Sequence, residues 1–304
     1  MIRMWPVPAQ ADGQRLDAAL AALSGMSRAT CAGLIEQGRV TLGTQQAVKS
    51  ARVAFGDIVQ VELPDPDLAD PEPTVELPVV YQDMDMIVID KPAGVAAHPS
   101  QGWSGPTVTG SLQAMGVMLT MHGPPERRGI VHRLDVGTSG LMMLAKSEMA
   151  YADLKDKFRH REVEKVYHTM VQGRLDPPSG TIDAPIDRHP SSSYRFAVMD
   201  SGRPSITHYQ TVESFPYASL VEVELETGRT HQIRVHMSAL RHPCCGDLTY
   251  GADPKVAAIL GLERQWLHAV ELAVAHPATG EPMRWRSEYA PDLAAALERA
   301  RQLI

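Results

Sequence analysis

A proline-rich acidic stretch, "PDPDLADPEPTVELP" at residues 64–78, is the feature that most constrains the fold of this chain. It lacks the periodic hydrophobic residues with which a helix or a strand buries one face, and its composition is typical of an extended linker. The chain has 304 residues, more than one average domain needs. We therefore expect two domains, a small one at residues 14–63 and a large one at 79–304.

The linker also carries much of the acidity of the chain. It holds five acidic residues and no basic one: Asp65, Asp67, Asp70, Glu72 and Glu76. Without these five charges the formal net charge of −7 becomes −2. The net charge therefore does not argue against nucleic acid as a partner, and local groups of basic residues must decide.

The composition sets the broad class of protein. Hydrophobic residues make up 44% and charged residues 21%, which is ordinary for a soluble globular protein. No apolar run reaches membrane-spanning length, and the first residues, "MIRMWP", lack the apolar core of a signal peptide. Cys31, Cys244 and Cys245 have no metal-binding spacing. We expect a cytoplasmic protein with no structural zinc and no membrane partner.

The small domain shows two helical segments and short strands. Leu16, Leu20 and Leu23 recur at helical spacing, and Ser27 is placed to cap a second helix that ends before Gly38. Strand-like runs follow at 40–42 and 58–61. Five basic residues could face a phosphate, although the pattern alone favours a solvated surface: Arg15, Arg28, Arg39, Lys49 and Arg52.

The large domain alternates strand-like runs with shorter helical ones. A charged amphipathic helix is predicted over 148–161. The runs that predict strands are 86–89, 141–144, 163–171, 220–225 and 272–275. This pattern indicates an α+β fold, with a mixed, mainly antiparallel sheet and flanking helices.

Two segments of the large domain place polar residues beside probable strands. In "GIVHRLDVGTSGLMML" (129–144), Asp135 precedes a glycine-rich turn, and the local pattern alone favours a turn residue. In "EVEKVYHTMVQG" (162–173), Tyr167 lies on an alternating strand, where a tyrosine is more often part of the core. A third segment, "DKPAGVAAHPS" (90–100), is consistent with a plain turn.

The segment "LETGRTHQIRVHMSAL" (225–240) is more unusual. If a helix begins near Thr230, Arg229, Gln232 and His236 share one face of it, whereas Ile233 and Met237 share a core face. A guanidinium, an amide and an imidazole are costly to bury together unless they find partners. A carboxylate such as that of Asp135 is a natural partner for Arg229.

Other common types of site have no support in the sequence. His231, His236 and His242 lack the spacing and the acidic neighbours of a metal site. There is no Walker A loop, no GxGxxG after a strand and no GxSxG elbow, so nucleotide cofactors and serine hydrolysis are disfavoured.

Taken together, these segments resemble the RluA/RluD family of ribosomal large-subunit pseudouridine synthases. The resemblance rests on five motifs that occur in the family's order: "HRLD…TSGLM", "EKVY", "TGRTHQIRVHM", "GDLTYG" (246–251) and "LHAVELAVAHPATGE" (267–281). Residues 14–63 resemble the S4-type RNA-binding domain of many members. The resemblance implies a pseudouridine synthase catalytic fold preceded by a small S4-like α/β RNA-binding domain.

The resemblance also implies roles for individual residues. Asp135 corresponds to the catalytic aspartate, and Arg229 to the arginine that pairs with it and keeps it ionised and oriented. Tyr167 resembles the tyrosine that stacks on the target base and is placed to take the C5 proton. The further candidates for substrate binding are Arg133, which would enter the stack where the nucleotide is flipped out, Ile233, which would contact the uracil face, His132 and Gln232.

One departure from the family pattern lies beside the aspartate. Val136 stands where many members have lysine, and Gly137 follows it in place of an aspartate. Neither change touches a residue with a chemical role, so we expect an active enzyme.

The implied function is site-specific isomerisation of uridine to pseudouridine in large-subunit (23S) ribosomal RNA. No cofactor is needed, because uracil is both the leaving group and the returning nucleophile. Attack of the carboxylate at C1′ and removal of the 2′ proton remain alternative mechanisms. A transfer-RNA substrate and a non-catalytic RNA-binding or assembly factor are alternative functions. We expect a monomer that binds a ribosomal RNA stem-loop, free or in an assembling large-subunit particle.

Overall fold

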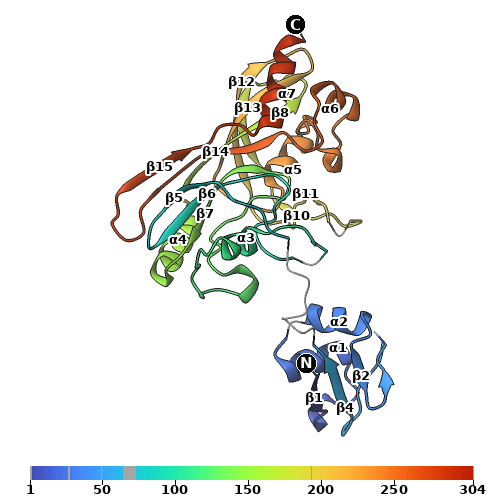
Figure 1. Ribbon diagram of the computed structural model, residues 1–304. Coiled ribbons are helices and arrows are strands. Elements are labelled where there is room, and N and C mark those ends of the chain that lie inside the picture. Colours follow the sequence, from blue (N-terminus) through green and yellow to red (C-terminus); the bar gives the residue numbers. More distant parts are fainter. Residues whose placement is uncertain are drawn as a thin grey trace. The chain divides into compact units, whose positions relative to one another are not determined.

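The computed structural model describes residues 2–26, 28–48, 50–63, 73–100, 102–192 and 194–303. The chain divides into two compact units, Met1–Pro71 and Glu72–Ile304 (Figure 1). Most of the predicted linker, residues 64–72, lies outside the described residues, as do Ser27 and Lys49. Each unit has its own hydrophobic core.

The N-terminal unit is a four-stranded sheet with two helices, in the strand order β1-β4-β2-β3. Leu16 and Leu20 are fully buried in its core against Val40 and Val59, as the helical spacing predicts. Its elements are β1 (Ile2–Pro6), the 3-10 helix η1 (Ala9–Ala11), α1 (Leu16–Ser24), α2 (Arg28–Glu36), β2 (Val40–Leu42), β3 (Gln45–Gln46) and β4 (Ile58–Glu62). Because β1 pairs with β4 along its whole length, the unit begins well before residue 14, and the predicted boundary was too late.

The larger unit contains a nine-stranded sheet and the other described helices. The strands are β5 (Val79–Gln82), β6 (Met86–Lys91), β7 (Ser139–Ala145), β8 (Glu164–Gln172), β9 (Ser179–Asp183), β10 (Ile186–Arg188), β11 (Phe196–Val198), β12 (Ile206–Ser214), β13 (Ala218–Leu225), β14 (Leu267–Ala275) and β15 (Pro282–Arg286). The helices are α3 (Val108–Ala114), η2 (Pro125–Arg127), α4 (Glu148–His160), α5 (Gln232–Ala239), η3 (Leu248–Tyr250), α6 (Pro254–Leu260) and α7 (Pro291–Gln302). No helix of the described residues is long and apolar enough to cross a membrane.

The sheet is mixed and mainly antiparallel, which confirms the predicted fold class. Its order is β5-β6-β7-β14-β8-β13-β12-β9, with β15 paired to β14, while β10 and β11 form a separate hairpin. Among the described strand pairs only β7 and β14 run parallel. The unit starts earlier than residue 79, because Leu77 is 1% exposed in its core and Val75 packs there. These residues were wrongly assigned to the linker.

The alternation of side chains along the strands gives the sheet two different faces. On one face, Ile87 and Met142 pack under α3 and α5 together with Tyr167. On the other face, Val88 packs against α4, and Met170 packs against α6 and α7. Figure 1 shows α4 near one end of the sheet and α6 and α7 near the other. Among the described residues, the hydrophobic cores on this second face contain helices only near its two ends, and no helix from these cores covers the middle of the face.

The loop that carries Asp135 enters the sheet where β14 changes its partners. The first part of β14 runs beside β7, with Ser139 opposite His268 and Gly140 opposite Ala269. The rest of β14 pairs with β15 instead. The hydroxyl of Ser139 and Nδ1 of His268, 2.9 Å apart, tie the two strands together in the interior. The start of β7 is thus held both by its backbone pairing with β14 and by the buried contact between Ser139 and His268.

Gly140 meets a steric requirement at this junction, and its replacement tests the arrangement. Its φ is +109°, and an added Cβ would lie 2.3 Å from the Ala269 carbonyl oxygen. We predict that Gly140→Ala lowers the free energy of unfolding by about 3 kcal/mol or more. Gly280 has φ +74° but nothing near an added Cβ, so Gly280→Ala should cost only about 1 kcal/mol. Equal losses in urea denaturation would contradict the steric argument.

Candidate active site

Asp135 lies in a turn that the surrounding chain fastens through its backbone. The N–H of Thr138 donates to the Asp135 carbonyl at 3.0 Å and closes the turn. The Val136 carbonyl accepts the N–H of Gly94 at 2.8 Å, and the Gly137 carbonyl accepts Arg264 Nη1 at 2.9 Å. These contacts use backbone atoms, so the valine that departs from the family pattern at 136 serves the turn through its carbonyl group.

Lys91, which the sequence placed in a plain turn, is completely buried beside this loop. Its ammonium group donates to the carbonyls of Pro92 and Val95 at 2.9 and 2.8 Å, and to that of Val136 at 3.4 Å. Burial lowers the pKa of Lys91 to about 7, although the charge of Asp135 acts in the opposite direction. Lys91 therefore joins the 91–95 turn to the aspartate loop.

The carboxylate of Asp135 is paired with Arg234, and not with Arg229 as predicted. Arg234 Nη1 donates to Asp135 Oδ2 at 3.2 Å. Arg229 instead directs its Nε to the Pro204 carbonyl at 3.2 Å, because the chain is still in a loop at residue 229 and α5 starts only at Gln232. The predicted pairing partner of Asp135 was therefore wrong by five residues.

Arg234 is held from its other side by a second aspartate. Its Nε donates to Asp247 Oδ2 at 2.6 Å and its Nη2 to Asp247 Oδ1 at 3.0 Å, a bidentate contact that fixes the guanidinium plane. The ring of Tyr250 lies 4.9 Å from the guanidinium carbon. Asp247 is only 2% exposed, so the pair is an interior one. Both partners come from the "GDLTYG" motif, to which the sequence analysis gave no residue roles.

The sequence could not choose between the two arginines, because α5 is buried on nearly all sides. All six residues from Gln232 to Met237 are buried, so no polar face distinguishes one arginine from the other. A useful signal was nevertheless present. Arg234 lies inside the helix, whereas Arg229 follows Gly228 in a loop, and a position within a regular element is held more rigidly.

Gln232 has no free hydrogen-bonding group, which argues against its predicted role in binding substrate. Its Oε1 accepts from the Thr227 hydroxyl at 2.8 Å and from the Arg229 N–H at 3.0 Å. Its Nε2 donates to the Ile206 carbonyl and to the Thr207 hydroxyl, both at 3.0 Å. These four bonds use the full capacity of the amide. Gln232 therefore anchors α5 to β12, and because it also lines the pocket beside Asp135, its contact with substrate stays a prediction.

His132 is also occupied within the fold. Its Nε2 accepts the N–H of Met143 at 2.9 Å, and its ring stacks on Phe158 with centroids 4.8 Å apart. Burial lowers the pKa of His132 to about 3, with a smaller contribution from the charge of Lys165. The imidazole is therefore a neutral packing group between β7 and α4, and its role in substrate binding stays a prediction.

A small pocket of about 60 Å³ opens beside the carboxylate of Asp135. Tyr167, Ile233 and Arg133 line it together with Asp135 and Arg234. Tyr167 and Ile233 are buried, and Arg133 is exposed. The pocket thus joins a carboxylate, an aromatic ring and an aliphatic side chain beneath an exposed cation. That combination suits a planar base attached to a phosphate backbone.

The surroundings of Tyr167 hold it as a neutral phenol. Burial raises the pKa of Tyr167, and the charge of Asp135 raises it further. The ring therefore offers a stacking surface and a hydroxyl, but little phenolate. This disfavours the predicted use of Tyr167 as the base that takes the C5 proton, because a base must first lose its own proton.

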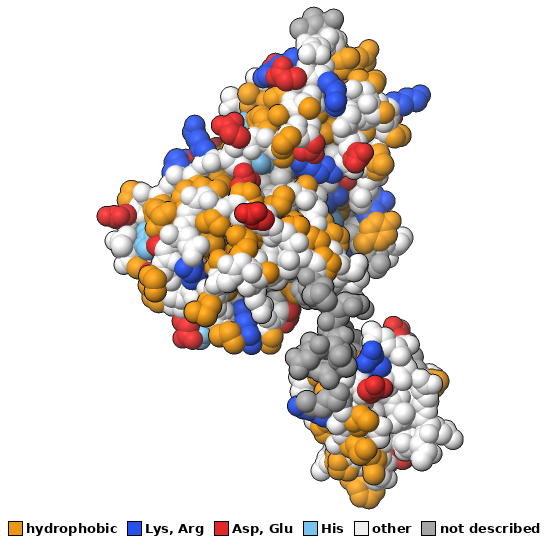
Figure 2. Space-filling model, viewed as in Figure 1, with side chains coloured by type: hydrophobic (Ala, Val, Ile, Leu, Met, Phe, Trp, Pro, Cys, Tyr) orange, Lys and Arg blue, Asp and Glu red, His pale blue; other side chains and the backbone are white. Residues whose placement is uncertain are grey.

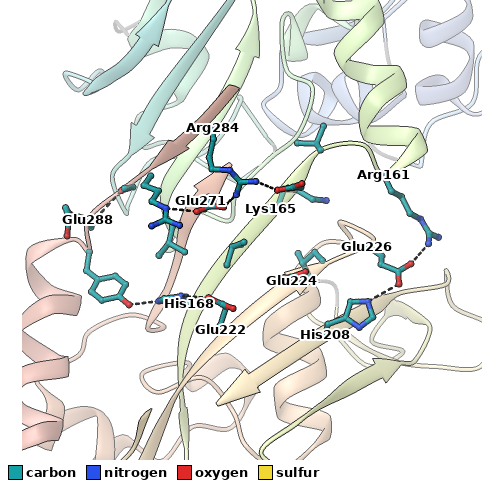
Figure 3. A pocket seen from close by; sticks show the side chains of 18 residues that line it. Arg161, Lys165, His168, His208, Glu222, Glu224, Glu226, Glu271, Arg284 and Glu288 are labelled. Carbon is teal, nitrogen blue, oxygen red and sulfur yellow. Dashed lines mark hydrogen bonds and ion pairs between the residues drawn. The ribbon is translucent and has the colours of Figure 1, made fainter. Parts of the chain in front are cut away.

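A larger pocket, of about 760 Å³, lies on the opposite face of the sheet (Figure 3). Glu164 and His168 line it, and they alternate along β8 with Tyr167, which faces the other way. Figure 3 shows that several of its charged side chains contact one another: Arg161 pairs with Glu226, and Arg284 pairs with Glu271. Arg284 also pairs with Glu164. These ion pairs are consistent with a polar sheet surface between α4 and α7. Asp135 and Arg234 are not among its lining residues.

The basic residues of the N-terminal unit are partly engaged in the fold. Arg15 and Arg28 each donate to the buried carboxylate of Asp17, at 3.1 and 3.0 Å, and these hydrogen bonds lower the pKa of Asp17 to about 2. Arg52 donates to the Gly13 carbonyl at 2.6 Å. On the face shown in Figure 2, basic side chains of the whole chain are dispersed among apolar and acidic ones. RNA binding by Arg15, Arg28, Arg39, Lys49 and Arg52 stays a prediction.

No group of three or more histidine, cysteine, aspartate or glutamate side chains among the described residues is arranged to hold a metal ion.

Comparison with known proteins decides the family. The sequence profile of the RNA pseudouridylate synthase family matches residues 85–239, which include Asp135, Tyr167 and Arg234. An uncharacterized RNA pseudouridine synthase of Mycobacterium bovis is 54% identical over 303 residues, covering 97% of each chain. This chain belongs to the RNA pseudouridylate synthase family. It is thus an enzyme, an RNA pseudouridine synthase that isomerises uridine, and the hypothesis of a non-catalytic factor is set aside.

Relatives and solved structures agree with this assignment. The ribosomal large subunit pseudouridine synthase D of Nitrosomonas europaea is 39% identical over 309 residues, which cover 98% of this chain and 87% of the relative. The human RNA pseudouridylate synthase domain containing 4 superposes with a TM-score of 0.58 at 26% identity, over 74% of this chain and 93% of that one. The resemblance to the RluA/RluD family and the pseudouridine synthase fold are therefore confirmed.

The two arginines provide a direct test of the site. Arg234→Lys keeps a charge but cannot contact both aspartates in the same plane. We predict that it lowers kcat at least about 100-fold in an assay of tritium release from RNA labelled at uracil C5. Arg229→Gln should lower kcat far less, because Arg229 lines the pocket but directs its Nε to the Pro204 carbonyl and not to Asp135. The opposite ranking of the two variants would show that Arg229 is the partner of Asp135.

The burial of His132 predicts a specific pH dependence of stability. The unfolded chain binds a proton at His132 near pH 6.5, whereas the folded protein does so only near pH 3. The free energy of unfolding should therefore fall as the pH decreases through this range, by about 2 kcal/mol between pH 7.5 and pH 5. His132→Gln should lack this contribution, because glutamine can accept the Met143 N–H without titrating. Denaturation curves that respond equally to pH would contradict the assignment.

Proposed function

We propose that this enzyme converts specific uridines of large-subunit ribosomal RNA to pseudouridine, with Asp135 as the catalytic carboxylate. The observation that carries the proposal is the placement of Asp135, paired with Arg234 at the pocket that Tyr167 and Ile233 line. Arg234 contacts Oδ2 only. Among the described residues Oδ1 has no hydrogen-bond partner, and it is the oxygen available to substrate.

The chemistry needs little besides an oriented carboxylate. The N1–C1′ bond breaks, the uracil turns over within the pocket, C5 bonds to C1′, and the proton on C5 leaves to restore the ring. Asp135 can begin this sequence either by attacking C1′ or by removing the 2′ proton. In both routes the carboxylate must aim one oxygen at the ribose, and the Arg234 contact with Oδ2 leaves Oδ1 for this.

The other residues of the pocket would hold the base while the bond is broken. Tyr167 supplies an aromatic face for stacking and Ile233 an apolar contact, so the detached uracil stays within reach of C1′. Exposed Arg133 adjoins Asp135 and is placed to occupy the position that the flipped nucleotide leaves. Flipping costs a few kcal/mol and least where the base is unpaired, which favours a uridine in an RNA loop.

The substrate class rests on relatives and on the N-terminal unit. The proteins named ribosomal large subunit pseudouridine synthase D match nearly the whole chain at 38–39% identity. We propose that residues 2–63 form the S4-like module and bind a stem-loop of the same RNA, free or in an assembling large-subunit particle. Transfer RNA is the alternative substrate, and the catalytic residues do not distinguish the two.

One experiment tests both parts of the proposal. Large-subunit ribosomal RNA and transfer RNA, each labelled with tritium at uracil C5, are incubated with the wild-type protein and with Asp135→Asn. We predict tritium release from ribosomal RNA by the wild type and at least about 10³-fold less by Asp135→Asn, which cannot act as a base or a nucleophile. Wild-type release from transfer RNA alone would overturn the substrate assignment. Equal release by both proteins would overturn the role of Asp135.

A further inference from the structure

His231 occupies an unusual backbone conformation directly before α5. Its φ of 58° and ψ of 20° lie in the left-handed region, which residues other than glycine seldom adopt. Such a conformation persists when the surroundings hold it, and it is frequent at functional sites. The imidazole lies edge-on to the rings of Phe196 and Tyr250, with centroids 5.7 and 5.6 Å away. This packing brings Nε2 to 3.8 Å from Asp135 Oδ2.

The hydrogen bonds around Tyr250 determine which nitrogen of His231 carries the proton. The backbone N–H of Phe196 can only donate, and it donates to Tyr250 Oη at 3.0 Å. The hydrogen of that hydroxyl is then free to point at His231 Nδ1, 2.7 Å away. We assign Nδ1 as the acceptor of this bond, so that in the neutral imidazole the proton lies on Nε2, the nitrogen that faces Asp135.

Burial favours the neutral form of His231, while the charged groups around it act in both directions. Burial lowers the pKa of His231, and this effect outweighs the charge of Asp135, which raises it. Arg234 and Arg133 lower the pKa further, while Asp247 raises it. Burial also raises the pKa of the Tyr250 hydroxyl, which therefore keeps its hydrogen for Nδ1. At neutral pH Tyr250 and His231 are thus both uncharged. The Tyr250 hydroxyl donates to His231 Nδ1, and His231 Nε2–H faces the Asp135 carboxylate.

We propose that His231 is a second positioning residue for Asp135, presenting an Nε2–H that Tyr250 holds in that tautomer. His231 and Arg234 face the same oxygen, Oδ2, and leave Oδ1 for the ribose. At 3.8 Å the contact is longer than a hydrogen bond, as is common before substrate binds, and it shortens in the complex with RNA. The proposal rests on the catalytic role of Asp135 and adds the two residues that orient it.

Two substitutions at His231 separate this role from simple packing. The amide nitrogen of glutamine reaches the position of Nε2, whereas that of asparagine reaches only the position of Nδ1. We expect His231→Gln to lower kcat about threefold and His231→Asn about thirtyfold, with KM for RNA unchanged in both. Asparagine fits a left-handed backbone better than glutamine, so backbone strain biases this comparison against the proposal.

Substitution of Tyr250 tests the control of the tautomer. Tyr250→Phe keeps the ring against Arg234 but removes the hydroxyl, so the proton can move to Nδ1 and leave a lone pair facing Asp135. We expect about a tenfold lower kcat in this variant and no further loss when it is combined with His231→Gln, whose amide does not need Tyr250. Long-range ¹H–¹⁵N spectra of the full chain, labelled at histidine, should show the Nε2–H form in the wild type and a mixture in Tyr250→Phe.

The outcomes separate this inference from the function on which it rests. Equal kcat for His231→Gln and His231→Asn, additive losses in the double variant, or an Nδ1–H signal in the wild type would each overturn the role of His231. None of these results bears on Asp135 if Asp135→Asn remains inactive in the same assay. Activity of Asp135→Asn would overturn the catalytic assignment itself, and with it this role of His231.

Discussion

Arg234 is buried between two aspartates, and the geometry of the active site depends on how it divides its five N–H groups. Two nitrogens bind Asp247 in a bidentate contact, and the third reaches Asp135. An isolated charge at this depth would be expensive, so neither Arg234 nor Asp247 is stable there without the other. The buried Arg234–Asp247 pair fixes the position of the guanidinium group that contacts Asp135. Asp135 can therefore lie at the pocket surface and still have a defined orientation.

The sheet supplies the rigid frame that this contact requires. Arg234 lies within α5, which packs on the same face as Tyr167, while Asp135 precedes β7 where it meets β14. Gln232 and His236 join α5 to β12 through saturated polar contacts, and Lys91 joins the aspartate loop to its neighbouring turn. Many polar groups of these motifs thus serve to hold a few reactive ones.

Much of the architecture followed from the pattern of residues. The helix over 148–161, the strands near 86–89 and 141–144, and the mixed sheet were predicted from periodicity, which buried faces impose on any chain. The early start of both units was missed, as were several elements: the strands β1, β3, β5, β9, β10, β11, β12 and β15 and the helices α3, α6 and α7. Two of these strands, β1 and β15, have weaker patterns, because they lie at exposed positions and gain their structure from the partner strand.

The sequence by itself determined the family and the fold class and singled out Asp135 and Tyr167 as candidates, because ordered motifs and hydrophobic periodicity are properties of the linear chain. Only the tertiary structure decided that Arg234 and not Arg229 meets Asp135, that His132 and Gln232 serve the fold, and that Asp247, Tyr250 and His231 surround the site. The physical reason is that the residues from Gln232 to Met237 in α5 are all buried, so the pattern of polar and apolar residues does not indicate which side of the helix faces the site. The partner of each polar group depends on segments far away in the chain, 99 residues for Asp135 and Arg234 and 129 residues for Ser139 and His268.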